Sequence, residues 1–152
     1  MDALELIKRD HDEMRELLEQ ATGTAEGDAS RYDLLTRIKH ELLAHEQMEE
    51  QVLYPVLRTK QEAKDIVLEG YEEHHVANIV LEELYDTPVG DDRWGPRMKV
   101  LKESIEHHME EEEGEMFAKA RKTIDEETRG RLGDQMERIK QEALATQSDE
   151  ER

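Results

Sequence analysis

The stretch AHEQMEEQVLYPV, residues 44–56, has the three- and four-residue spacing of an amphipathic helix, but it carries a histidine and a glutamate on its apolar face. The apolar stripe that begins at Ile38 and Leu42 continues through His45 and Glu49. A carboxylate is almost never buried in a protein unless it is paired or bound to a metal. This helix therefore predicts a buried polar site in which Glu49 needs a compensating charge.

The same polar pattern recurs when the sequence is shifted by 63 residues. Each half of the chain then has a histidine and, 34 residues later, the motif HxxxE. A single HxxxE pair arises easily by chance in an acidic helix, whereas two in register with two further histidines form a specific signal. The residues predicted to share one buried site are His11, His45, Glu49, His74, His108 and Glu112.

Three further histidines lie outside this repeat and off the apolar stripes, which favours a surface position for His40, His75 and His107. His75 and His107 each adjoin a predicted site histidine in sequence. Either of them could replace its neighbour if the helical phase differed by one residue.

Apolar periodicity predicts an all-α fold with helices over 2–21, 30–59, 62–85, 97–121 and 125–146. Pro55 should bend or end the second helix. Four long amphipathic helices with short connections bury their stripes together as an antiparallel up-down-up-down bundle, which we expect over residues 1–121. A short C-terminal helix over 122–146, packed on the bundle, and a frayed tail over 147–152 should follow.

Two other features of the sequence bear on the helix boundaries. Trp94 and Pro96 are expected in the loop before the fourth helix, where they would cap the end of the bundle. Gly130 and Gly133 weaken the prediction of the fifth helix, because glycine disfavours a helix interior.

The composition excludes several classes of function. With 21 Lys and Arg against 40 Asp and Glu, the formal net charge is -19, which disfavours binding to nucleic acid or to an anionic membrane surface. No apolar run is long enough for a membrane span, and the first residues lack the apolar core of a signal peptide, so we expect a cytoplasmic protein. Because the chain has no cysteine, any metal must be held by nitrogen and oxygen ligands.

Residues four apart on a helix share a face, so each HxxxE motif presents an imidazole and a carboxylate together. The first and third helices add one imidazole each. Four histidines and two carboxylates exceed the needs of one tetrahedral zinc and suit a pair of metals such as iron or manganese. The alternative is a plain helical bundle in which these side chains hydrogen-bond one another.

The order H, HxxxE, H, HxxxE, together with EEQVLYP at 49–55 and EEEGEMF at 111–117, resembles the hemerythrin-like, or HHE cation-binding, domain over residues 1–121. The resemblance implies a four-helix bundle around a non-haem di-iron centre with an oxo or hydroxo bridge. It also implies a ligand set in which two histidines hold each iron and two glutamates bridge the pair. The implied ligands are His11 and His45 for one iron, His74 and His108 for the other, and Glu49 and Glu112 as bridges.

The family's oxygen carriers have HxxxH on the third helix, whereas the residue four after His74 is Asn78. The resemblance therefore favours reaction with a small molecule, above all hydrogen peroxide in a catalase-like reaction or dioxygen, over reversible oxygen carriage. The alternative is a di-iron sensor of oxygen, nitric oxide or iron level without turnover. Glu46 could be an additional ligand, and Tyr54 could be one only if the helix is distorted before Pro55.

Overall fold

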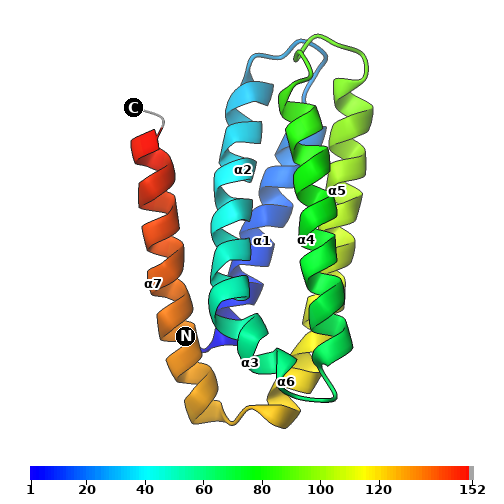
Figure 1. Cartoon of the computed structure of the whole chain (residues 1–152). Helices are drawn as coiled ribbons and strands as arrows, with labels where there is room; N and C mark the ends of the chain where they lie inside the picture. The colour runs from blue at the N-terminus through cyan, green and yellow to red at the C-terminus, as the bar shows by residue number, and fades with distance from the viewer. Residues whose placement is uncertain (151–152) are drawn as a thin grey trace.

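Four long helices, α1 (Ala3–Thr22), α2 (Ser30–Met48), α4 (Lys64–Tyr85) and α5 (Trp94–Glu111), run alternately up and down side by side (Figure 1). The computed structural model describes residues 1–150, and the side chains of residues 1–147. The other elements are η1 (Glu49–Leu53), α3 (Tyr54–Arg58), η2 (Glu112–Met116), α6 (Phe117–Thr123) and α7 (Glu126–Glu150). This architecture confirms the predicted all-α, antiparallel four-helix bundle with an additional C-terminal helix.

Local chemistry explains the start of α1 and permits that of α5. The side chain of Asp2 caps α1 by accepting a hydrogen bond from the backbone N–H of Glu5 at 2.9 Å. Helix α5 begins at Trp94, so the prediction that Trp94 and Pro96 lie in a loop was wrong. Trp94 is buried beneath the guanidinium of Arg31, and Pro96 lies in the first turn, where its missing N–H has no intrahelical partner to lose.

Both long helices that carry an HxxxE motif widen into one π-helical turn at the glutamate of that motif. Element η1 starts at Glu49 and η2 starts at Glu112, in register with the 63-residue repeat. A π turn holds one more residue than an α turn and so rotates the side chains that follow it. The distortion expected near Pro55 is present, but it begins six residues earlier, and it changes where Tyr54 points.

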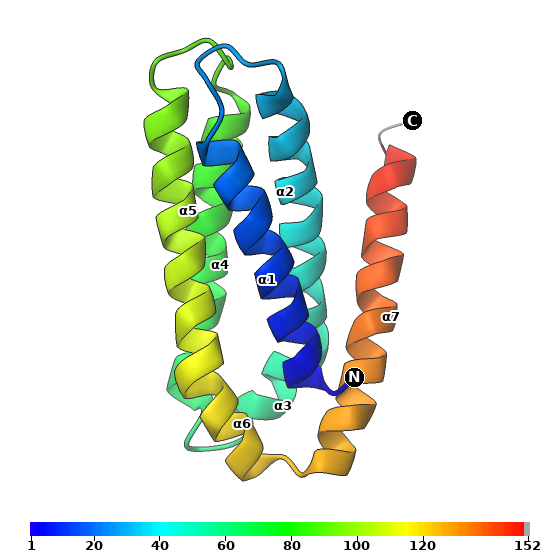
Figure 2. The ribbon, with the colours of Figure 1, turned by 180° about the vertical axis from the view of Figure 1, so that it is seen from behind.

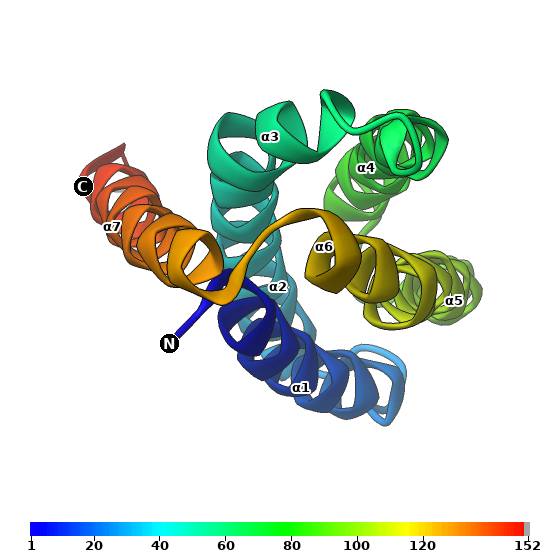
Figure 3. The same cartoon turned by 90° about the horizontal axis from the view of Figure 1, so that it is seen from below.

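The bundle interior has two apolar clusters with a polar layer between them. One cluster, near helices α3 and α6 that Figure 3 shows at one end of the bundle, includes Leu4, Ile7, Leu53, Leu57, Val67, Phe117 and Met136. The other, toward the loops of the opposite end, includes Leu17, Leu18, Ile38, Leu81, Trp94, Met98 and Leu101. The predicted site residues lie in the polar layer between these clusters.

Helix α7 lies outside the bundle and packs against α1 and α2 (Figure 2). The approach is close at Gly133, where an added Cβ would lie 2.7 Å from the backbone carbon of Asp2. Gly133, which was expected only to disfavour the helix, therefore permits the close packing of α7 against the start of the chain. Helix α7 is also longer than predicted: it continues to Glu150, through most of the expected tail at 147–152, and residues 151–152 lie outside the described part of the chain.

Within residues 1–150, no helix combines the length and the apolar character that a bilayer span requires.

Candidate metal centre

The structure brings all six predicted site residues together in the polar layer of the bundle. Each of them is buried, with at most 9% of its surface exposed. One ligand candidate comes from each long helix and one from each π turn: His11 (α1), His45 (α2), Glu49 (η1), His74 (α4), His108 (α5) and Glu112 (η2).

Their donor atoms form two groups that share one residue. Atoms of Glu49, His74, His108 and Glu112 lie within 4.8 Å of one another, and so do atoms of His11, His45 and Glu112. Two adjoining groups with a common carboxylate have the composition of a paired metal site.

Each glutamate lies between a histidine of the first half and a histidine of the second. Oε1 of Glu49 is 3.2 Å from Nε2 of His45 and 3.3 Å from Nε2 of His74. Oε1 of Glu112 is 3.1 Å from Nε2 of His11 and 3.4 Å from Nε2 of His108. Each carboxylate therefore links the two halves of the chain within the layer.

Several of these buried polar atoms lack a hydrogen bond to any residue that the structure describes. They are Nε2 of His45 and both carboxylate oxygens of Glu49, which is fully buried; Nε2 of His45 and Oε1 of Glu49 lie at ion-pair distance but lack hydrogen-bond geometry. Leaving buried polar groups unsatisfied costs about 1–3 kcal/mol each, and more when they are charged. A cation between these atoms would satisfy them, so the donor set fits a bound metal better than a plain hydrogen-bonded core.

The other ring nitrogen, Nδ1, of each site histidine lies at hydrogen-bond distance from a carboxylate. Such contacts fix the ring and its tautomer, leaving Nε2 for a metal. The pairs are His11 with Glu113 at 2.7 Å, His45 with Asp10 at 2.9 Å, His74 with Glu50 at 3.0 Å and His108 with Glu73 at 2.8 Å. We call Asp10, Glu50, Glu73 and Glu113 the Nδ1 carboxylates.

The sequence reasoning missed these four residues, although they also obey the repeat. Asp10 shifts onto Glu73, and Glu50 shifts onto Glu113. Each of them adjoins one of the six site residues in sequence. Extending the 63-residue comparison to the neighbours of the site residues would have found them.

The electrostatics of the metal-free site favour ion pairs. Burial lowers the pKa of His45, but Glu49 and Asp10 raise it more, to about 10. Burial likewise opposes charge on His74, and Glu49 and Glu50 nevertheless raise its pKa to about 9. Burial raises the pKa of Glu112, yet His108 outweighs it and holds that pKa well below the usual value. Metal binding must therefore displace protons from the histidines.

The π turn η1 aims Tyr54 into the site. Its hydroxyl donates a hydrogen bond to Oε2 of Glu112 at 2.7 Å, and its ring stacks on His74 with centroids 5.5 Å apart. Gly70 on α4 makes room for this ring, because a Cβ there would lie 2.7 Å from the Tyr54 hydroxyl oxygen. The distortion that the sequence required for Tyr54 to reach the site is thus present.

Glu46 also lies at the site, on the side toward the apolar cluster of the loop end. Its Oε1 accepts a hydrogen bond from Asn78 at 3.0 Å, while Oε2 has no hydrogen-bond partner among the described residues. Burial raises the pKa of Glu46 to about 7. Asn78, which stands where an oxygen carrier would have a histidine, therefore holds Glu46 in place.

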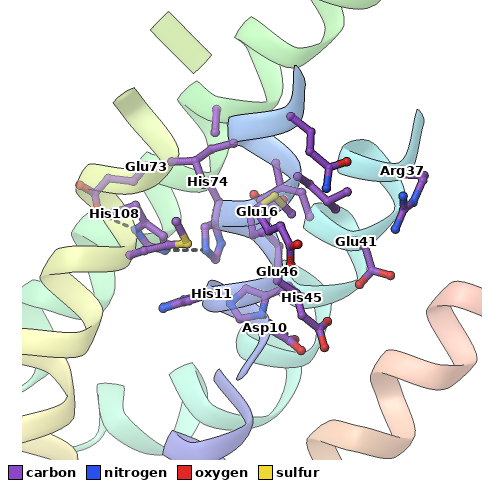
Figure 4. A pocket seen from close by; sticks show the side chains of 18 residues that line it. Asp10, His11, Glu16, Arg37, Glu41, His45, Glu46, Glu73, His74 and His108 are labelled. Carbon is purple, nitrogen blue, oxygen red and sulfur yellow. Dashed lines mark hydrogen bonds and ion pairs between the residues drawn. The ribbon is translucent and has the colours of Figure 1, made fainter. Parts of the chain in front are cut away.

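A cavity of about 240 Å³ connects this layer with the surface (Figure 4). Site histidines line its inner end, apolar side chains such as Met14, Leu42 and Ile105 line its wall, and exposed Glu16 and Arg37 belong to its outer part. A small molecule thus has a route to the site histidines that is lined by both apolar and charged side chains.

The remaining histidines do not replace their neighbours in the layer. His75 and His107 are exposed, whereas the adjacent His74 and His108 are buried, and His40 is half-buried on α2. His107 instead approaches Glu111 at 3.0 Å on the surface.

Comparison with known proteins agrees with this geometry. The hemerythrin HHE cation binding domain family matches residues 2–120, so the chain belongs to that family of cation-binding helical domains. A crystal structure of a hemerythrin HHE cation binding domain-containing protein from Mycobacterium kansasii superposes with a TM-score of 0.86 at 22% identity, covering 96% of this chain and 89% of that one. The two chains share the fold. No curated protein sequence matches the chain.

Proposed function

We propose that this domain holds a non-haem di-iron centre that reacts with hydrogen peroxide, decomposing it, or with dioxygen. In this proposal His11 and His45 bind one iron and His74 and His108 the other. Glu49 and Glu112 bridge the two. The observation that carries the proposal is the pair of buried donor groups that share Glu112.

Neither glutamate needs to move far to serve both metals, because each already lies within 3.4 Å of a histidine from either half. The Nδ1 carboxylates hold the imidazole rings so that their Nε2 atoms face Glu49 and Glu112. The bound irons would supply the redox change and the Lewis acidity that the side chains lack.

The chain itself contributes the environment of the reaction. The two apolar clusters flank the layer on either side, and the cavity gives a small molecule access to its site histidines. Glu46 lines this cavity and offers Oε2 as a hydrogen-bonding group to a molecule bound there. These features support turnover of a small molecule more than storage of iron.

The test is metal analysis of protein produced with ample iron, combined with its visible spectrum before and after addition of hydrogen peroxide. We expect about two irons per chain, the absorption of a bridged ferric pair, and oxygen evolution from peroxide. His45→Ala and Glu112→Ala should each lose metal and absorption, because they remove a buried ligand from the proposed centre.

His75→Ala is the matched control, since His75 is exposed beside the proposed ligand His74. It should retain both irons. Two irons with no oxygen evolution would instead favour the sensing role, to be examined by nitric oxide binding. A folded protein without stoichiometric iron, manganese or other metal would leave the plain helical bundle.

A further inference from the structure

The two halves of the site have matching ligands but differ in the charges behind them. We refer to the His11/His45 site and the His74/His108 site. In both, the histidines contact two Nδ1 carboxylates, which carry negative charge toward the metal position. The difference lies in whether those carboxylates are themselves neutralised.

Behind the His11/His45 site, both carboxylates are paired with cations. Asp10 accepts a hydrogen bond from Lys140 of α7 at 2.7 Å, with both side chains about 5% exposed. Glu113 forms an ion pair with Arg15 at 2.5 Å, and Lys8 lies 3.5 Å from it. The negative charge behind this site is therefore largely compensated.

Behind the His74/His108 site, the corresponding carboxylates lack such cations. Among the residues that the structure describes, no lysine or arginine forms an ion pair with Glu50 or Glu73. Glu73 faces its partner His108 at 2.8 Å, the exposed His107 at 3.9 Å and a further carboxylate, Glu111, rather than a lysine or arginine. This site thus keeps more of the negative charge of its Nδ1 carboxylates.

Lys140 is the most buried of the compensating cations, and it comes from outside the matched family domain, which ends at residue 120. It lies at the end of a continuous path from α7 through Asp10 to Nδ1 of His45. A positive charge in this low-dielectric interior acts strongly on a neighbouring cation. Its charge opposes that of a metal on His45.

We propose that the two metal sites differ in affinity, and that Lys140 is the positioning residue that weakens the His11/His45 site through Asp10. The proposal rests on the di-metal centre described above. The His74/His108 site fills first and tightly, and the His11/His45 site fills second. The C-terminal helix thereby sets the occupancy of one half of the centre.

The experiment is anaerobic calorimetric titration of the metal-free full chain with Fe²⁺. The wild type should bind two ions in two steps that differ in affinity at least about tenfold. Glu73→Gln should weaken the tight step roughly 10–100-fold, and Asp10→Asn should weaken the second step by a similar factor, because each removes an Nδ1 carboxylate.

Lys140→Met distinguishes the effect of the positive charge of Lys140 from a purely structural role in holding Asp10 in place. It should strengthen the second step several-fold, toward the tight one, because Asp10 would then act on His45 without compensation. Lys140→Arg keeps the charge and should behave as the wild type. Arg138→Met, which removes an exposed cation from the same helix, is the matched control and should also change nothing.

Two equal steps in the wild type would overturn the proposal, as would loss of the tight step in Asp10→Asn. If Lys140→Met weakened the second step, Lys140 would only hold Asp10 in place, and the proposal would be wrong. Should Lys140→Met fail to fold, the contrast between Glu73→Gln and Asp10→Asn decides the order of filling. Fewer than two bound ions per chain would refute the di-metal centre itself. Two bound ions whose affinities do not change in Lys140→Met would refute only the role of Lys140.

Discussion

At the scale of single residues, the site is built so that each histidine is held by a carboxylate on one nitrogen and offered to a metal on the other. Without metal, the same carboxylates stabilise the protonated rings. Asp10 illustrates this: burial raises its pKa, but hydrogen bonds from His45 and Lys140 outweigh that effect and hold its pKa at about 2. The metal-free chain is therefore stabilised by ion pairs that metal binding must replace.

These pairs predict a pH dependence with a definite sign. The raised pKa of His45, about 10 against an ordinary 6.5, contributes stability that is complete below pH 6.5 and is lost as the pH rises toward 10. The lowered pKa of Asp10 contributes stability that is present above its ordinary 3.8 and is lost toward pH 2. Chelator-treated protein should thus melt at a lower temperature at pH 9 than at pH 6.

Metal-loaded protein should respond in the opposite sense, because a neutral imidazole is the ligand and fewer protons compete as the pH rises. Thermal melts of loaded and metal-free protein between pH 6 and 9 should show a gap that widens with pH. A metal-free melting temperature that increases from pH 6 to 9 would contradict the assigned ion pairs.

Gly70 and Tyr54 are coupled by close packing of the Tyr54 ring against the backbone at Gly70. In Gly70→Ala the added Cβ would crowd the Tyr54 ring, whose hydroxyl and Cζ atoms lie within 3.0 Å of it, and such overpacking costs roughly 1–3 kcal/mol. Tyr54→Phe alone leaves Oε2 of Glu112 without its donor, at a cost of about 1–3 kcal/mol. Both variants should therefore unfold at lower urea concentration than the wild type.

Combining the two changes tests whether they act on the same contact. Phenylalanine removes the oxygen nearest the new Cβ, so the double variant should lose less stability than the sum of the single variants. Strict additivity would show that Gly70 serves another purpose.

At the scale of helices and turns, the periodicity of apolar residues was sufficient to predict the long helices. The positions of His45 and Glu49 on an apolar stripe indicated the buried polar site. The π turns could not be counted from the sequence. Elements η1 and η2 fall at equivalent places in the repeat, so both halves contain the same extra residue. Aligning the halves at an offset of 63 residues therefore shows no insertion that would reveal the π turns. Pro55 alone indicated a distortion.

Helix α7 offers a matched pair of glycines. Gly133→Ala would drive a Cβ into the backbone of Met1 and Asp2, whereas nothing lies within 4 Å of a Cβ at Gly130. We expect Gly133→Ala to lower the free energy of unfolding by roughly 1–3 kcal/mol through overpacking. Gly130→Ala should raise it by up to about 1 kcal/mol, because alanine favours the helix. Equal effects of the two changes in urea unfolding would show that α7 does not dock at Gly133.

At the scale of the whole molecule, the candidate centre joins all four long helices and both π turns. Metal should therefore stabilise the bundle as a unit. At a free concentration 100 times the dissociation constant, binding adds about 2.7 kcal/mol, which corresponds to a rise in melting temperature of roughly 5–10 °C for a chain of this size. Scanning calorimetry with Fe²⁺ under anaerobic conditions, and again after a chelator, measures it.

His75→Ala should show the same rise, because its exposed side chain lies outside the layer, whereas His108→Ala should lose most of it. If both variants kept the full increase, the stabilising metal would be bound elsewhere on this acidic surface.

The whole-molecule arrangement also explains what local sequence patterns could not predict. The Nδ1 carboxylates lie one position off the apolar stripes among 40 Asp and Glu, so only the 63-residue repeat, and nothing local, distinguishes them from solvated surface groups. The contact between Lys140 and Asp10 joins positions 130 residues apart. It depends on how α7 docks, which local periodicity does not specify.

The exchange of carboxylates between the halves has a consequence for the origin of the fold. His11 of the first half relies on Glu113 of the second, and His74 of the second half relies on Glu50 of the first. A half-length chain would therefore complete such a centre only as a homodimer around a two-fold axis. The present chain has the arrangement that end-to-end fusion of such a dimer produces, and fusion is what allows one half alone to acquire a cation such as Lys140.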